Sequence, residues 1–132
     1  MEYSIKTKKA QEFIDITELV RETIKKDKIE NGVVVVFVPH TTAGVTINEN
    51  ADPDVIVDIL SGLNQAFPVK NGYMHAEGNS HAHIKASIMG SSCYIIVENG
   101  ELKIGVWQGI YFCEFDGPRN RKVYVYGNTG RL

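Results

Sequence analysis

The sequence lacks the features of a membrane or nucleic-acid-binding protein. No apolar run approaches the roughly 20 residues that a membrane-spanning helix needs, and residues 1–13 contain no apolar segment typical of a secretion signal. The net charge of −2 is small, and the lysines and arginines form no stripe. A polyanion surface is therefore a poor expectation. We expect a cytoplasmic protein with no membrane or nucleic-acid partner.

Cysteine is also scarce. The two cysteines, Cys93 and Cys113, form no CxxC pair and cannot build a disulfide framework. Both lie in strand-like apolar runs, where small buried hydrophobic residues are the ordinary expectation. The sequence contains no P-loop, no dinucleotide fingerprint and no HExxH motif. The common nucleotide-binding and metalloprotease motifs are thus excluded.

What is present is the composition of a globular protein. Of the 132 residues, 43% are apolar and 23% charged, which fits a single domain spanning 1–132. Short apolar or alternating runs predict strands, and the run at 33–38 is apolar throughout, as in a strand buried on both faces. The predicted strands are 3–7, 12–14, 33–38, 45–47, 94–97, 102–104, 106–115 and 122–126.

Three segments have helical patterns. Asp15 and Glu18 form a candidate capping box before an amphipathic helix of about three turns, and Asp52-Pro53 caps and begins a second helix. The third runs over 82–89 and ends at Gly90. Together these elements predict an α+β fold in which an antiparallel or mixed β-sheet folds over on itself like a sandwich, with two or three helices packed outside.

The histidines suggest a metal site. Of the four, His40, His75 and His83 lie in polar surroundings at the ends of elements. Neutral imidazole is the commonest metal ligand, and three such nitrogens leave an open position for catalysis on zinc. Ordinary surface or hydrogen-bonded histidines fit the same pattern. His81 is the weakest candidate, because positions two apart on a helix face different ways.

Polar residues gather after the predicted strand 45–47. The segment 48–54 places oxygens at alternate positions, but an EF-hand would need glycine where Pro53 stands and glutamate where Ile59 stands. Helix capping accounts for Asp52 but not for the polar residues before it. We expect these to belong to a site: Asn48, Glu49 and Asn50.

Other candidates lie beside buried strands. Thr41 and Thr42 follow His40 and could contact phosphate oxygens, although no Walker lysine accompanies them. Glu114 lies in a strand with two apolar faces, so it is either paired with a base such as Arg119, which we favour, or part of a pocket wall. Trp107 is either core or pocket lining, and its neighbours Gln108 and Gly109 favour the pocket.

The same stretches resemble the YjbQ-like proteins, a family associated with secondary thiamine-phosphate synthase activity. The resemblance rests on HTTAGVTINENADPDV at 40–55, EGN at 77–79 with AHIKAS at 82–87, and GVWQGIYFCEF at 105–115. It covers nearly the whole chain. Two residues depart from the family pattern: Val106 stands where threonine is usual, and His81 where an acid or a small residue is common.

The resemblance implies a homotrimer with sites near subunit boundaries, and a divalent metal held by His40, His75 and His83. Zinc, nickel, cobalt and iron all suit such ligands. The surrounding polar shell would comprise Asn48, Glu49, Asp52, Glu77 and Glu114. Acids such as Glu49 or Glu77 would orient the substrate or move a proton, with His83 at the reacting centre. Thr41, Thr42, Asn48, Asn50, Asp52, Trp107, Glu114 and Arg119 are the expected substrate-binding residues.

The implied reaction joins hydroxymethylpyrimidine diphosphate to a thiazole phosphate with release of diphosphate, as a weak activity beside an unsettled primary role. Three functions fit the residues. The first is a metal-dependent enzyme of this transferase type, acting on a small phosphorylated metabolite. The second is a metal-dependent hydrolase, because a metal-bound water is a nucleophile at neutral pH. The third is a non-enzymatic protein that binds a metal or metabolite.

Overall fold

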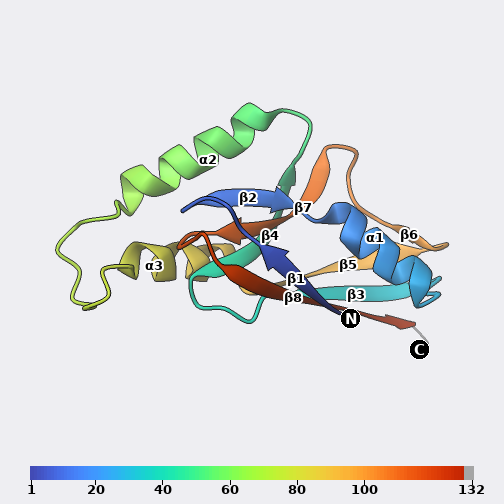
Figure 1. Cartoon of the computed structure of the whole chain (residues 1–132). Helices are drawn as coiled ribbons and strands as arrows, with labels where there is room; N and C mark the ends of the chain where they lie inside the picture. The colour runs from blue at the N-terminus through green and yellow to red at the C-terminus, as the bar shows by residue number, and fades with distance from the viewer. Residues whose placement is uncertain (130–132) are drawn as a thin grey trace.

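The computed structural model describes residues 1–129 as two antiparallel sheets that face each other (Figure 1). The larger sheet has the order β1 (Glu2–Lys6), β8 (Asn120–Thr129), β3 (Gly32–Phe37), β5 (Ser92–Glu98) and β6 (Glu101–Leu102). The smaller has the order β2 (Glu12–Asp15), β7 (Gln108–Glu114) and β4 (Ala43–Glu49). Every strand pair is antiparallel, so the predicted α+β fold is confirmed.

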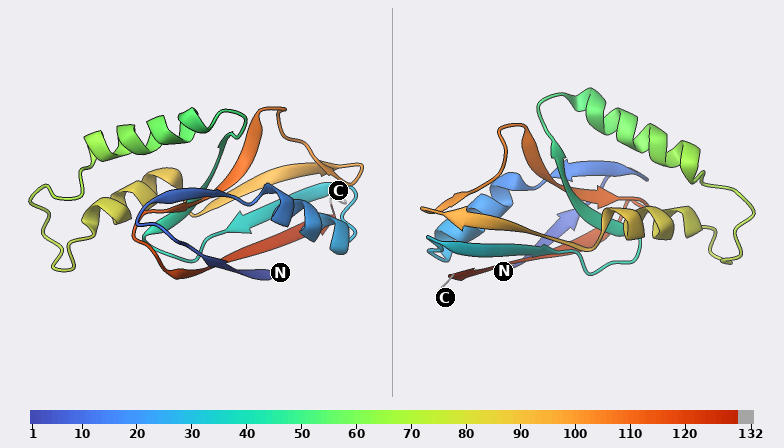
Figure 2. Two further views of the ribbon diagram at one scale, coloured as in Figure 1. Left: turned by 45° about the horizontal axis from the view of Figure 1, so that its top comes forward. Right: turned by 180° about the vertical axis from the view of Figure 1, so that it is seen from behind.

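Three helices complete the fold: α1 (Thr17–Lys26), α2 (Pro53–Ala66) and α3 (Ser80–Met89). Figure 2 shows α1 at one end of the molecule, and α3 with the 67–79 loop at the other. The main core lies between the sheets and receives Val20 and Ile24 from α1. A second cluster lies under α3, around Ala82 and Ala86. By contrast, α2 has no fully buried residue.

Strand β7 supplies both cores because successive side chains point to opposite faces. Ile110 and Phe112 enter the core between the sheets, whereas Tyr111 and Cys113 pack under α3. The expectation that both cysteines are small packed residues is met: Cys113 is buried and Cys93 partly so. Burial raises the pKa of Cys93 to about 11, so its thiol stays protonated at neutral pH.

The predicted capping residues behave differently at the two helices. At α2, Asp52 accepts the backbone N–H of Asp54 and Pro53 is the first helical residue, as predicted. At α1, Asp15 accepts both the N–H and the hydroxyl of Thr17. Glu18, however, pairs with Arg21. The reciprocal half of the capping box is therefore absent.

The prediction that 33–38 is buried on both faces is wrong. Val34 and Val36 are buried, but Val33, Val35 and Phe37 are each about 40% exposed. The inner side chains meet the smaller sheet, and no element of residues 1–129 covers the outer ones. They join residues of β5 and β8, of which Tyr124 is half-buried and the others exposed, in an apolar sheet face made of Val33, Val35, Phe37, Tyr94, Ile96, Tyr124 and Tyr126.

The ends of β4 and β7 also differ from prediction. Ala43 and Gly44, expected in a loop, belong to β4, because β4 and β7 pair from Ala43–Glu114 to Glu49–Gln108. Trp107, expected in a strand, lies in a turn and is 63% exposed. Its carbonyl accepts the N–H of Asn50. Trp107 is therefore not a core residue.

Gly44 is needed where β4 passes the end of α3. A Cβ atom there would lie 2.6 Å from the carbonyl oxygen of Gly90 and 3.2 Å from the Cβ of Met89. Because one of these neighbours is backbone, relief requires the strand or the helix end to move. We expect Gly44→Ala to lower the free energy of unfolding by about 1–3 kcal/mol in urea denaturation. Gly62→Ala, where a Cβ meets nothing within 4 Å, is the control that should not destabilise.

Candidate functional site

Two histidines from separate elements line one hollow at the α3 end of the molecule. His40 follows β3, two residues beyond the buried Val38, and His83 lies on the half-buried face of α3. The hollow has a volume of about 500 Å³, and we call it the imidazole groove. Its lining residues are His40, Thr41, Ala43, His83, Ala86, Ser87, Gly90 and Ser91. This volume is in the range of small-molecule sites.

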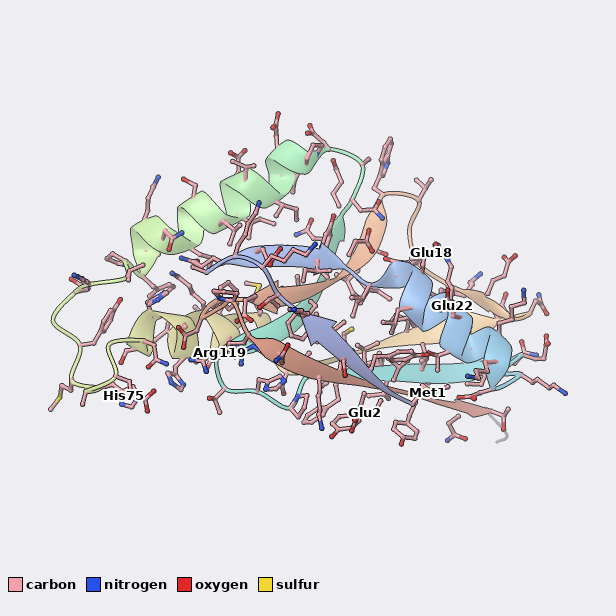
Figure 3. All side chains as sticks on the ribbon, in the orientation of Figure 1. Met1, Glu2, Glu18, Glu22, His75 and Arg119 are labelled. Carbon is pink, nitrogen blue, oxygen red and sulfur yellow. The ribbon has the colours of Figure 1, made fainter. Side chains whose placement is uncertain are left out.

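His75 lies next to this groove. It belongs to the loop between α2 and α3, and Figure 3 shows it far from α1, which carries Glu18 and Glu22. The ring centroids of His75 and His83 are 5.4 Å apart. Glu77 Oε1 is 3.9 Å from His75 Nε2. The structure thus brings His75, His83 and Glu77 together.

His40 is held differently from the other two. Its Nε2 accepts a hydrogen bond of 2.9 Å from the backbone N–H of Lys122 on β8. Burial and, next, the positive charge of Arg121 lower the pKa of His40, so the ring is neutral at pH 7. The nitrogen that accepts this bond has no free lone pair for a metal.

The fit to a metal ion is therefore partial. His75 and His83 are placed as two imidazoles that could share an ion. The third predicted ligand, His40, already uses its Nε2. Within residues 1–129, no three His, Cys, Asp or Glu side chains form a group that could hold a metal. A three-histidine site remains a prediction that would need a change at His40.

Beneath the groove lies a buried ion pair. Glu114 is fully buried and meets Arg121, whose Nε donates to Glu114 Oε1 at 2.8 Å and whose Nη2 donates to Oε2. The hydroxyl of Thr7 also donates to Oε1, and Arg121 Nη2 donates to Thr42 Oγ1 at 2.8 Å. The pair closes the space between the two sheets, because Glu114 comes from β7 and Arg121 from β8. Glu114 and Thr42 thus lie under the groove and do not line it.

The prediction that Glu114 pairs with a base is confirmed. The suggested partner, Arg119, is wrong. Arg119 binds Asp116, with Nη2 2.9 Å from Oδ2 and Nε donating to the carbonyl oxygen. Asp116 also accepts the side-chain N–H of Asn79, directly before α3. Side chains alternate along β8, so Arg121 points inward with Val123 and Val125, whereas Arg119 lies in the exposed turn.

The pH dependence of stability should follow from Glu114. Burial alone would raise its pKa, but hydrogen bonds from Arg121, the Asp116 N–H and Thr7 outweigh burial and lower the pKa. The unfolded carboxyl titrates near pH 4.3. The folded chain therefore binds fewer protons, so this contribution is complete above about pH 5 and is lost as the pH falls through the folded pKa.

Urea denaturation between pH 3 and 7 tests whether stability is lost towards acid pH. We expect the free energy of unfolding to fall with acidity below about pH 5. Glu114→Gln should be less stable at pH 7 and should show a weaker decline. Asp116, whose pKa is also lowered by Asn79 and Arg119 against the effect of burial, adds to the decline in both proteins. If the free energy of unfolding falls equally steeply with pH in the two proteins, Glu114 is not a cause of the decline.

The other predicted site residues lie at the far end of β4. The strand begins beside Thr42 and ends at Glu49, a span of about 20 Å. Asn50 donates to Asp15 Oδ2 at 3.2 Å, and Tyr111 donates to the carbonyl oxygen of Glu49. Within one chain the structure therefore does not bring Asn48, Glu49, Asn50, Asp52 and Trp107 to the imidazole groove.

Sequence reasoning missed a second buried polar cluster, centred on Lys85. Its side chain is fully buried, and its Nζ lies 2.6 Å from Asn64 Oδ1 and 2.8 Å from His81 Nδ1. Burial lowers the pKa of Lys85, and burial followed by Lys85 lowers that of His81. The signal available was the spacing of four residues between His81 and Lys85. His81 is thus a packing partner of Lys85, which links α3 to α2 through Asn64, and it lies on a different face of α3 from His83.

The sequence profile of the family described as "UPF0047 protein YjbQ-like" matches residues 1–128. The chain belongs to this family. Among relatives, it is 52% identical over 122 residues to the UPF0047 protein YugU of Bacillus subtilis, covering 92% of each chain. It is 51% identical over 123 residues to a UPF0047 protein of Methanocaldococcus jannaschii, covering 93% of this chain and 89% of that one.

Solved structures share the YjbQ-like fold. A Clostridium acetobutylicum protein described as an uncharacterized conserved member of the family superposes with a TM-score of 0.96 at 62% identity, over 97% of this chain and 99% of that one. A Sulfolobus solfataricus protein described as of unknown function gives 0.94 at 31% identity, over 98% and 96%. The fold is therefore retained while most of the sequence changes.

A hollow of about 480 Å³ lies between α1 and the β5–β6 hairpin, with Ile24, Ile29 and Leu102 in its lining. It contains none of the predicted site residues. In the part of the chain that the structure describes, the helices are all too short or too polar to cross a bilayer.

Proposed function

We propose that this YjbQ-like protein is a metal-dependent enzyme that binds a small phosphorylated molecule in the imidazole groove. The observation that carries the proposal is the convergence of imidazoles distant in the sequence. His40 and His83 line one hollow, and His75 lies against His83. His40 and His83 are half-buried at the hollow and His75 is exposed, and packing alone explains such a grouping poorly.

The other groups of the groove suit a phosphate. Thr41, Ser87 and Ser91 lie around it and carry hydroxyls that can donate to anionic oxygens. A divalent metal at His75 and His83 would neutralise charge on a departing phosphate or diphosphate. Glu77 lies beside His75 and is the acid of this chain placed to orient a substrate or accept a proton. Glu49, at the far end of β4, could act only from a neighbouring copy.

The finer proposal for the reaction rests on the family resemblance. The thiazole ring nitrogen forms a bond to the methylene carbon of hydroxymethylpyrimidine diphosphate, the carbon–oxygen bond breaks, and diphosphate leaves with the bonding electrons. The groove would supply cationic and hydrogen-bonding groups for the departing diphosphate. We propose this as a weak activity, because the resemblance leaves the primary role open.

We further propose that three copies assemble through the apolar sheet face. Its aromatic and aliphatic residues lie side by side on three adjacent strands, and a continuous apolar surface of this kind often marks an interaction site. The lack of buried residues in α2 also suits a helix that packs against a neighbour. Such an assembly could bring the polar end of β4 in one copy towards the imidazole groove of another.

Replacement of His83 tests the enzyme proposal. We expect His83→Ala to lower thiamine-phosphate formation by about 100-fold or more and to reduce bound metal, measured by elemental analysis of the purified protein. Glu22→Ala, exposed on α1 at the opposite end, is the control with unchanged turnover. Unchanged turnover in His83→Ala would reject the site.

A substrate panel with and without chelator separates the other two functions. Cleavage of phosphorylated metabolites without carbon–nitrogen bond formation would identify a hydrolase. Tight calorimetric binding of substrate with no product after long incubation would identify a binding protein. Both outcomes would retain the groove and reject the transferase reaction.

A further inference from the structure

We infer that His40 acts as a hydrogen-bond donor to a phosphate oxygen through its Nδ1–H, and is not a metal ligand. The inference rests on the proposed function for the identity of the ligand, but its structural basis is independent of it. That basis is the contact between His40 Nε2 and the backbone of β8.

The direction of this hydrogen bond decides which ring nitrogen of His40 carries the proton. A backbone N–H can only donate, and the N–H of Lys122 lies 2.9 Å from His40 Nε2. The Nε2 lone pair must therefore accept it. A neutral imidazole carries one proton, so this proton is on Nδ1. Such a ring has no lone pair left to coordinate a metal, but it offers one N–H donor.

The Lys122 backbone and the His40 segment both neighbour residues that bond to the buried ion pair. Arg121 precedes Lys122 and is bonded to Glu114 through two nitrogens. Arg121 also donates to Thr42 Oγ1, two residues after His40. The two segments that carry the backbone N–H and the imidazole are thus tied to each other through the Arg121 guanidinium. The tautomer of His40 is set by the fold before any ligand arrives.

The Nδ1–H donor of His40 is available to a ligand of the groove. The ring lines the groove with His83 and Thr41, and Nδ1 has no acceptor among residues 1–129. An unused donor at a hollow calls for an acceptor from the ligand. The hydroxyls of Thr41, Ser87 and Ser91 are further donors around the same hollow, so a ligand with several acceptor oxygens is favoured. Phosphate supplies such oxygens.

Imidazole nitrogen NMR of uniformly labelled protein tests the tautomer. In the metal-free protein at pH 7.5, the proton of His40 should be on Nδ1, with Nε2 unprotonated. On addition of zinc, the ring nitrogens of His75 and His83 should shift while those of His40 keep their pattern. Addition of inorganic phosphate should shift the His40 Nδ1–H. A His40 proton on Nε2, or a zinc-induced change at either His40 nitrogen that matches those of His75 and His83, would overturn the inference.

A pair of variants separates this inference from the proposed function. His40→Ala should weaken binding of inorganic phosphate by about tenfold or more and leave zinc affinity within about twofold. His83→Ala should weaken the binding of zinc and leave the binding of inorganic phosphate largely unchanged. If zinc fails to bind the wild-type protein, the metal part of the proposed function fails while the tautomer and phosphate results still stand. If His40→Ala weakens zinc as much as His83→Ala does, His40 is a ligand and the inference is wrong.

Discussion

Replacing Arg121 with alanine should lower the free energy of unfolding by about 3–5 kcal/mol, because it leaves the carboxylate of Glu114 buried without its partner. Glu114 is fully buried and Arg121 is only 6% exposed, so water cannot replace the lost bonds without opening the space between the sheets. Urea denaturation at pH 7, followed by circular dichroism, measures the change. If the variant proves too unstable to purify, its unfolding in crude extract by pulse proteolysis gives the same comparison.

Arg119→Ala is the matched control. Arg119 makes a geometrically similar pair with Asp116, but its side chain is 51% exposed. Exposed pairs contribute little, so we expect a loss of about 1 kcal/mol or less. Comparable losses of unfolding free energy in the two variants would mean that burial does not distinguish these arginines. The buried pair would then not be what holds the two sheets together here.

Val35→Lys should convert the proposed trimer into monomers. Val35 lies in the middle of the apolar sheet face, opposite Tyr94 on one side and Tyr126 on the other. A lysine there would place a charge among groups that the assembly removes from water, which costs several kcal/mol at each copy. Light scattering should show the mass fall from three times 14.7 kDa to one.

Val106→Lys provides the comparison for this surface. Val106 is 86% exposed but lies in the turn before β7, away from the sheet face. It should leave the mass unchanged. Dissociation by Val106→Lys and not by Val35→Lys would place the interface at the far end of β4, and a wild-type mass of 14.7 kDa would reject the assembly altogether.

The sequence predicted the elements well where local chemistry decides them. Asp52-Pro53 marked the start of α2, and the two-residue alternation of Ile110 to Phe115 marked a strand with two covered faces. It failed at 33–38, because a run of valines looks the same whether its outer face meets another layer or water. Which face is covered depends on other parts of the fold and, as we propose, on other copies.

The grouping of the candidate site residues could be predicted only in part. His40, His75 and His83 do lie at one end of the molecule, yet the polar residues from Asn48 to Asp52 lie at the far end of β4, because most of this seven-residue strand separates them from His40. Likewise, nothing local distinguishes Arg121 from Arg119 as the partner of Glu114. Only the register of β8 against β1 and β3 turns Arg121 inward.

We propose above all that the imidazole groove of this YjbQ-like protein binds a metal and a phosphorylated ligand. The most direct test is a crystal grown with zinc and inorganic phosphate, with anomalous scattering recorded at the zinc edge. We predict one peak about 2.0–2.1 Å from a ring nitrogen of His83 and from one of His75, with phosphate between that ion and His40 Nδ1. A zinc peak at the Asn48–Asp52 segment, with the groove holding only water, would contradict the account.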